Sequence, residues 1–216
     1  MKISIGTNIK EGPWGGGNLF AINLKNYLLQ KNHKVVHNLI EDDIDIILIT
    51  EPRKTSESSA FTHFDVENYL KFVNKDALVV HRVNECDERK NTNYVNKYLI
   101  SANEIADYTV FVSSWIKNLY EKQGISKKNN VVIMAGADEK IFSKKKYIQD
   151  LTERKIKLTT HHWGANWNKG FDTYLLLDKL IGKEKYKDKI GFTYIGNIPK
   201  NVQFKYAKVL KPLSGN

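Results

Sequence analysis

The sequence predicts an α/β protein: a doubly wound parallel sheet with helices on both faces, followed by the start of a second domain of the same kind. Two observations carry this prediction. Short apolar segments alternate with longer amphipathic segments along the first 136 residues, which is the pattern of repeated strand–helix units. A polar, charged stretch then follows at 143–155, and the alternation restarts at Ile156.

The first domain is assigned to residues 1–145. Two of its expected strands are almost entirely apolar, as strands buried on both faces of a sheet are. Its expected helices carry apolar residues at intervals of three and four, and one of them ends at a glycine. The expected strands are 2–6, 33–39, 44–50, 77–83, 107–113 and 130–136, and the expected helices are 18–32, 65–75, 93–106 and 113–124.

The second domain is assigned to residues 156–216, after a linker at 146–155. It is expected to open with a strand, a helix and two further strands, at 156–163, 169–182, 191–196 and 204–210. About 60 residues are few for a well-buried domain of this type. We therefore interpret the chain as complete in its first domain and cut short in its second.

Composition limits the class of protein. With 41% hydrophobic residues the chain can bury a sizeable core, and the single cysteine, Cys86, cannot form an internal disulfide. The sequence shows neither a signal-peptide hydrophobic region nor an apolar run that approaches a membrane span. These features predict a cytoplasmic protein.

The positive charge is concentrated near the end of the chain. The net charge is +10, of which residues 155–216 carry +8, all from lysine. The simplest interpretation is a solvated, lysine-rich surface. The alternatives are an anionic ligand, peripheral contact with an anionic membrane surface, or nucleic acid.

Polar residues and glycines follow several of the predicted strands. The carboxyl ends of parallel strands meet at one edge of a doubly wound sheet, and ligands bind beyond that edge. Residues from separate parts of the sequence are therefore expected to converge there and to contact a substrate. They are the glycine-rich stretch from Gly12 to Gly17, Glu51, His81 with its neighbour Arg82, Ser113 and Gly136.

The glycine-rich stretch does not fit a dinucleotide fingerprint. Ten residues separate Gly6, at the end of the first strand, from the triple glycine Gly15-Gly16-Gly17, whereas a nicotinamide fingerprint turns tightly from strand into helix. A helix that offers its first backbone N–H groups to an anion suits the stretch better. A flexible glycine turn is the alternative.

The sequence predicts no metal site and no cofactor. Asp43 and Asp45 form an Asp-X-Asp pattern, but they precede an apolar strand and do not follow one, so Asp45 is expected to mark the start of that strand. His161 and His162 are adjacent and would point to opposite faces of a strand. A Gly-X-Ser-X-Gly nucleophile motif is also missing from the sequence.

Five segments, in order, resemble the family 4 glycosyltransferases of GT-B architecture, which have Rossmann-like domains. The stretch "GPWGGGNLFAINLKNYLLQKNHKVV" resembles the glycine loop and first helix of that family, and "ADYTVFVSSWIKNLY" resembles a later strand and helix. "VVIMAGADEKIF" matches the family's Asn-Gly-Val-Asp…Phe segment at Gly136, Asp138 and Phe142. "NKGFDTYLLLDKL" matches a Lys-Gly helix start at Lys169 and Gly170, and "FTYIGNIP" resembles the strand that follows.

This resemblance implies transfer of a sugar from a nucleotide-diphosphate donor, with retention of configuration and without a metal. The donor would bind mainly to the second domain, and a glycan or lipid-linked acceptor mainly to the first. Gly15, Gly16 and Gly17 would approach the donor, His81 would contact the reacting sugar, and Lys169 would neutralise the leaving diphosphate. Gly136 and Asp138 would contact substrate in the matched segment.

The chain departs from the family at three places. His162 and Trp163 lie where the family has a Gly-Arg pair, and Ala135 replaces an asparagine. The acidic pair that binds the donor in the family would lie beyond Asn216, so the sequence does not identify the donor or establish turnover by this chain alone.

Two other function classes remain as alternatives. The first is an anion- or nucleic-acid-binding α/β module that uses the basic tail, although no nucleic-acid motif accompanies the lysines and nucleic acid is not expected as a partner. The second is a nicotinamide-dependent oxidoreductase, which the spacing of the glycine-rich stretch disfavours.

Overall fold

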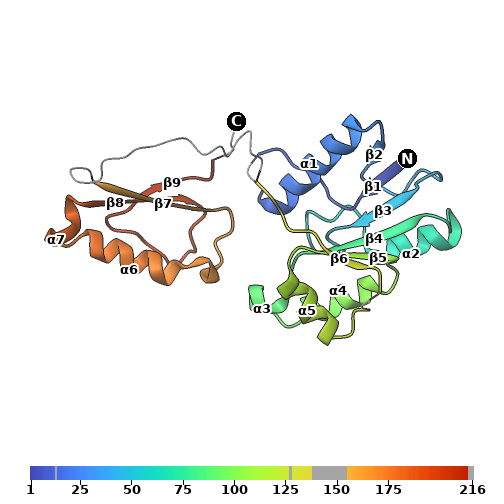
Figure 1. Ribbon diagram of the computed structural model, residues 1–216. Helices are drawn as coiled ribbons and strands as arrows, with labels where there is room; N and C mark the ends of the chain where they lie inside the picture. Colours follow the sequence, from blue (N-terminus) through green and yellow to red (C-terminus); the bar gives the residue numbers. More distant parts are fainter. Residues whose placement is uncertain (13, 127, 138–154, 214–216) are drawn as a thin grey trace. The chain divides into compact units, whose positions relative to one another are not determined.

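The computed structural model describes residues 1–12, 14–126, 128–137 and 155–213 (Figure 1). They form two compact units. The first comprises Met1–Lys10 and Gly16–Gly136, and the second comprises Glu11–Gly15 and the described residues from Ala137 onward. Within the described ranges, no helix is long and apolar enough to cross a lipid bilayer. The predicted linker 146–155 lies outside them except for Lys155, so the predicted domain limits stay predictions.

The first unit is built on a six-stranded sheet in the order β2-β1-β3-β4-β5-β6. Every neighbouring pair in it is parallel, as predicted. The strands are β1 (Lys2–Ile5), β2 (Lys34–Val36), β3 (Ile46–Ile49), β4 (Leu78–Val83), β5 (Tyr108–Phe111) and β6 (Asn130–Val132). The helices are α1 (Gly16–Gln30), α2 (His63–Phe72), α3 (Asp87–Lys90), α4 (Val95–Asn103) and α5 (Ser114–Lys122).

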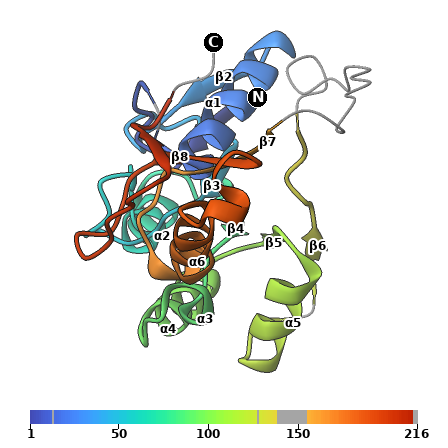
Figure 2. The same ribbon diagram turned by 90° about the vertical axis from the view of Figure 1, so that its left-hand side faces the viewer.

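Helices cover both faces of this sheet. Helix α1 packs on one face, where its Ala21 joins the buried side chains of Ile3 and Ile5. The other face carries α2, α4 and α5, and Figure 2 shows them on the opposite side from α1. There Ile47 packs with residues of α2, and Phe111 packs with residues of α4 and α5. Burial of both faces explains why the strands are nearly continuous apolar runs.

The second unit contains a separate three-stranded parallel sheet in the order β7-β8-β9. The elements are β7 (Ile156–His162), the 3-10 helix η1 (Trp167–Lys169), α6 (Phe171–Ile181), α7 (Glu184–Lys187), β8 (Ile190–Gly196) and β9 (Lys208–Leu210). The buried carboxylate of Asp178, on α6, accepts hydrogen bonds from the backbone N–H groups of Lys205, Tyr206 and Ala207 and so anchors the segment before β9.

Several elements are shorter than the sequence predicts, and hydrogen bonds explain two of these differences. Helix α4 begins at Val95, not at 93, because the carboxylate of Asp87 accepts the N–H groups of Tyr94, Val95 and Asn96 and caps the helix there. Strand β2 ends at Val36, where the ring of His37 turns to the carbonyl of Ile5. The single-turn helices α3 and α7 were not predicted, because so few residues establish no periodicity.

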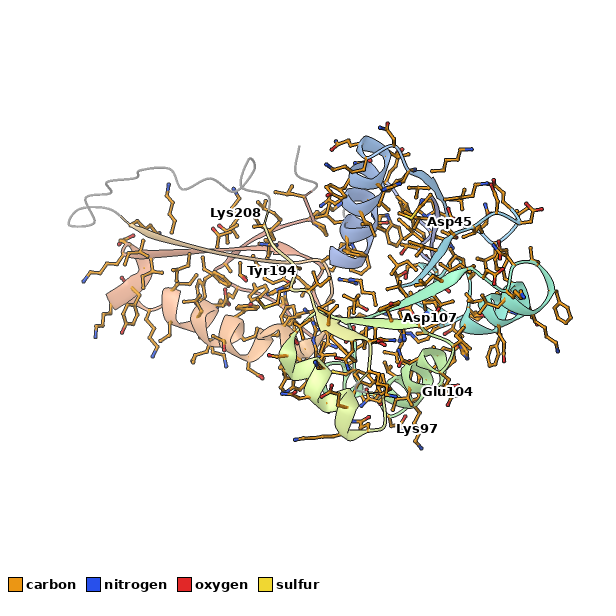
Figure 3. The ribbon with its side chains drawn as sticks, turned by 45° about the vertical axis from the view of Figure 1, so that its right-hand side comes forward. Asp45, Lys97, Glu104, Asp107, Tyr194 and Lys208 are labelled. Atoms are coloured by element: carbon orange, nitrogen blue, oxygen red, sulfur yellow. The ribbon has the colours of Figure 1, made fainter. Side chains whose placement is uncertain are left out.

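Two aspartates fix the register of the sheet at its amino edge. Asp45 precedes β3, as predicted, and its carboxylate accepts the backbone N–H of Lys2 at 2.6 Å. Asp107 precedes β5, and its carboxylate accepts the N–H of Val79 at 2.8 Å. Both are labelled in Figure 3. Each side chain ties the start of its strand to a neighbouring strand.

Replacing Asp107 with alanine is expected to lower the free energy of unfolding by about 1 kcal/mol, the usual worth of a hydrogen bond of this kind. Urea unfolding followed by circular dichroism measures the change. Asp76→Ala is the control, because Asp76 is exposed and its side chain bonds no backbone N–H group among the described residues. Equal stabilities for the two variants would contradict the role given to Asp107.

Candidate functional site

The glycine-rich stretch is closed at its base by one side chain. The amide of Asn18 accepts the backbone N–H of Lys10 at 2.9 Å and donates to the carbonyl of Lys10 at 2.8 Å. Lys10 in turn forms an ion pair with Glu57 at 2.6 Å. Asn18 is buried, so this clasp holds the two ends of the stretch together beside the end of β1.

The three glycines differ in conformation. Gly15 has a φ of +83°, a left-handed conformation that side chains rarely adopt. Gly16 and Gly17 are the first two residues of α1, so the helix begins two residues earlier than the predicted start at Asn18. A Cβ atom added to either would meet nothing within 4 Å. Glycine is therefore needed for the backbone at 15, whereas 16 and 17 leave open space in front of the helix.

Arg82 is a cation on the face of the sheet that α1 covers. It lies on β4 and faces α1, where its guanidinium lies 3.8 Å from the ring centre of Phe20. Burial lowers the pKa of Arg82 from its ordinary value. Among the residues that the structure describes, no carboxylate forms an ion pair with Arg82. A partly buried cation without a counter-charge is suited to bind an anion.

Glu51 follows β3, as predicted, but its charge is already matched. Arg53 donates to both of its carboxylate oxygens, at 2.6 and 2.5 Å, and both side chains are largely buried. Hydrogen bonding to Glu51 raises the pKa of Arg53. The next residue, Pro52, accepts the hydroxyl of Tyr98 from α4 through its carbonyl. This arrangement fixes the loop after β3 against α4.

The remaining predicted site residues of the first unit differ in their surroundings. Ser113 follows β5 and is the N-cap of α5, where its hydroxyl accepts the N–H of Ile116 at 3.2 Å. Gly136 is exposed, four residues beyond the end of β6. Asp138 and Phe142 lie outside the described residues. The topology thus brings the ends of β1, β3, β4, β5 and β6 to one edge, where Arg82 forms no ion pair with any residue of the described ranges.

His81 lies inside β4, within the predicted strand 77–83 and two residues before β4 ends. Its side chain is fully buried, so it does not make the surface contact with a substrate that was expected of it. Its Nδ1 lies 3.1 Å from the amide nitrogen of Asn103, and that amide also donates to the hydroxyl of Thr109. Burial, together with the nearby His63, lowers the pKa of His81 to about 3. Because side chains alternate along a strand, His81 faces α4 on one side of the sheet, while Arg82 faces α1 on the other.

The second unit places a lysine at the carboxyl edge of its own sheet. Lys169 is exposed at the end of η1, directly before Gly170, which has a φ of +98° and starts α6 without a side-chain cap. No ion pair to Lys169 occurs among residues 155–213 or the other described ranges. The ring of His162, at the end of β7, forms a hydrogen bond with the hydroxyl of Tyr174 at 2.7 Å. Burial, and to a smaller extent the positive charge of Lys169, lowers the pKa of His162.

The Asp-X-Asp pattern lies at the opposite edge of the first sheet. Asp43 pairs with the ammonium group of Lys2, which also pairs with Glu41. The hydrogen bonds that the ammonium group of Lys2 donates to Asp43 and to Glu41, in that order of effect, raise the pKa of Lys2 to about 12. Asp45 binds the backbone of Lys2, as described above. These carboxylates therefore stabilise the start of the sheet. In the part of the chain that the structure describes, no three His, Cys, Asp or Glu residues are grouped to hold a metal ion.

Comparisons with known proteins find matches in structure but not in sequence. No family model matches the chain, and a search of curated proteins found no sequence match. Solved structures do match. HepE of Anabaena, in complex with UDP and glucose, aligns with a TM-score of 0.61 and 12% identity over 97% of this chain and 68% of its own. An α-glucosyltransferase in complex with UDP and a 13-mer DNA aligns with a TM-score of 0.59 and 15% identity, over 99% and 68%.

The fold is that of GT-B glycosyltransferases. Two parallel sheets, each with helices, account for the alignment along nearly the whole chain. At sequence identities of 12% and 15%, the structural similarity shows the fold alone, so membership of family 4 stays a prediction.

Sequence reasoning missed two features of the first edge. The clasp by Asn18 was not predicted, although an asparagine directly after three glycines, at a helix start, is a recognisable signal. Phe20 is one of the apolar residues of the predicted helix 18–32, and its contact with Arg82 depends on a register that no local pattern reveals. Both residues support the glycine-rich stretch and the unpaired arginine.

Burial of His81 predicts that acid destabilises the protein. The native pKa, about 3, lies below the ordinary value of 6.5, so between these values the unfolded chain binds more protons. The contribution of neutral, buried His81 to the free energy of unfolding is fully present above about pH 6.5. It falls by up to about 1.4 kcal/mol per pH unit as the pH decreases, and it is lost below about pH 3. Urea unfolding across this range should show a shallower pH dependence for His81→Gln than for the wild type. Parallel curves would mean that His81 is protonated in the native state.

Proposed function

We propose that this protein is a glycosyltransferase that transfers a sugar, of the hexose type, from a nucleotide-diphosphate donor. The transfer retains the anomeric configuration and needs neither a metal nor a cofactor. The acceptor is a glycan or a lipid-linked glycan, and the donor binds mainly through the second unit. The transfer reaction takes place in the cytoplasm.

The GT-B fold is the observation that carries this proposal. The solved structures that share it contain UDP, and another crystal structure of HepE contains UDP-glucose, at a TM-score of 0.61 and 11% identity. One of these structures also contains glucose and the other also contains DNA, and neither molecule identifies the acceptor of this chain. For this reason the proposal for the acceptor rests on the family resemblance of the sequence.

The unpaired cations supply the chemistry that such a donor requires. When the glycosidic bond to the donor breaks, negative charge develops on the departing diphosphate, and cations and N–H groups that already point there lower the barrier. Lys169 is exposed, has no acidic partner among the described residues, and precedes the uncapped start of α6. Both a lysine and a helix N-terminus favour phosphate. We assign this position to the diphosphate.

Arg82 and the glycines form a second candidate binding region, which lies within the first unit. Gly16 and Gly17 keep the start of α1 open, and the guanidinium of Arg82 lies over Phe20 in the second turn of the same helix. We assign both to binding of the transferred sugar or its phosphate. Glu51, Ser113, Gly136 and Asp138 stay predicted substrate contacts. We assign His81 a supporting role beneath the sheet edge, since its full burial leaves no surface for a sugar.

Binding of UDP tests the donor assignment on the 216-residue chain itself. We expect calorimetry to detect UDP with and without a chelator, and Lys169→Ala to weaken the affinity about tenfold, the loss of one charge-assisted contact. Lys185→Ala is the matched control, since Lys185 is also exposed but lies on α7. Binding that disappears with chelator, or that tolerates Lys169→Ala, would refute the assignment.

Valine at position 16 tests the glycine assignment in an assay of sugar transfer. The backbone of Gly16 allows a side chain and nothing crowds its Cβ position, so the melting temperature should change by only a few degrees. If the sugar or phosphate passes there, kcat/KM should fall by about 100-fold, as misplacement at a reacting centre does. Asn26→Val, at an exposed position of the same helix, should leave both quantities near the wild type. Full activity of Gly16→Val would make the stretch purely structural.

A further inference from the structure

A groove of 520 Å³ lies in the first unit, away from the residues assigned above. One side is formed by 38–40, directly after β2, and the other by 60–61 and α2. Its volume falls within the range of small-molecule sites. Because all of its lining residues belong to one unit, the groove is complete without the rest of the chain.

The groove exposes aromatic and aliphatic surface. Ile40 is 82% exposed and Phe72 is 72% exposed, which is unusual for side chains of this size. Tyr69, also in the lining, is buried and fixed, because its hydroxyl donates to the carbonyl of Glu41 at 2.7 Å. Phe72 thus presents an accessible ring beside a rigid floor.

Polar groups of the lining are held in place by the backbone. The side-chain oxygen of Asn38 accepts the N–H of Ile40 at 3.1 Å, which orients the rest of its amide. One carboxylate oxygen of Asp65 accepts the N–H of Thr62 at 2.7 Å in a capping box, which orients the other. The exposed amide of Asn68 forms no hydrogen bond with the described residues, so both its donor and its acceptor are available.

Charge restricts the kind of ligand. Asp65 is the charged residue of the lining, and Lys71, whose ammonium group lies 5.0 Å from the ring centre of Phe72, is a neighbour outside it. A carboxylate within the lining disfavours phosphates and anionic lipid headgroups there, and an amide pair with a carboxylate matches hydroxyl groups that both donate and accept. An exposed aromatic ring suits the apolar C–H face of a sugar.

We propose that this groove binds a short, neutral oligosaccharide, as a carbohydrate site separate from the transfer site. The ring of Phe72 lies against one sugar, while Asn38, Asp65 and Asn68 bond its hydroxyl groups. The site holds a glycan on the protein surface whether or not the protein transfers a sugar.

Saturation-transfer NMR on the 216-residue chain tests the proposal, with cellotriose, maltotriose and chitotriose as probes. At least one should bind with a Kd of about 1 mM, as expected of an open groove with few polar contacts. Phe72→Ser and Asn68→Ala should each weaken binding several-fold. Tyr27→Ser is the matched control: Tyr27 is 57% exposed and has Lys31 5.7 Å from its ring centre, much as Lys71 lies 5.0 Å from that of Phe72, but it is outside the groove.

Three outcomes would overturn the proposal: none of the probes binds, Phe72→Ser binds like the wild type, or Tyr27→Ser loses as much as Phe72→Ser. Co-sedimentation with vesicles of phosphatidylcholine and phosphatidylglycerol is run in parallel. Vesicle binding that Phe72→Ser abolishes, without binding of the sugars, would assign the groove to a membrane. Because the assay uses neither donor nor turnover, its result is independent of the proposed transferase activity.

Discussion

The register of the six-stranded sheet is the constraint on which the rest of the first unit depends. Asp45 and Asp107 help to set that register at the amino edge, because their carboxylates accept backbone N–H groups at the first residue of β1 and the second residue of β4. A strand shifted by one residue would turn every side chain to the opposite face. Carboxylates at one edge therefore decide which side chains reach the helices and which reach the binding edge, about one strand length away.

Two adjacent residues of β4 illustrate this dependence. His81 faces α4 and is buried, whereas Arg82 faces α1 and forms no ion pair with the residues that the structure describes. From the sequence both followed an apolar run and both were candidates for the site. Only the register separates them, and the register is a long-range property that involves residues 45 and 107. Histidine is also readily accommodated as a neutral, buried group, so its residue type alone did not indicate function.

The fold itself could be predicted because it depends on local patterns. Alternating apolar and amphipathic segments predict the order of strands and helices, and the parallel sheet follows from that order. The ends of the elements could not be predicted, since side chains distant in sequence determine them, as Asp87 does for α4. The sequence also predicts that Glu51 follows the third strand, as it does, whereas no sequence pattern indicates that its carboxylate pairs with Arg53. Its role in a site stays a prediction.

The clasp between Asn18 and Lys10 has a consequence for how the protein could change over evolution. Because the ends of the intervening segment are tied to each other and not only to the sheet, the segment behaves as a closed loop. The entropy of closing a loop grows slowly with its length. Insertions or deletions between Lys10 and Asn18 would therefore alter the surface offered to a ligand while leaving β1 and α1 in place. Specificity in this part of the molecule can diversify without renewed selection for folding.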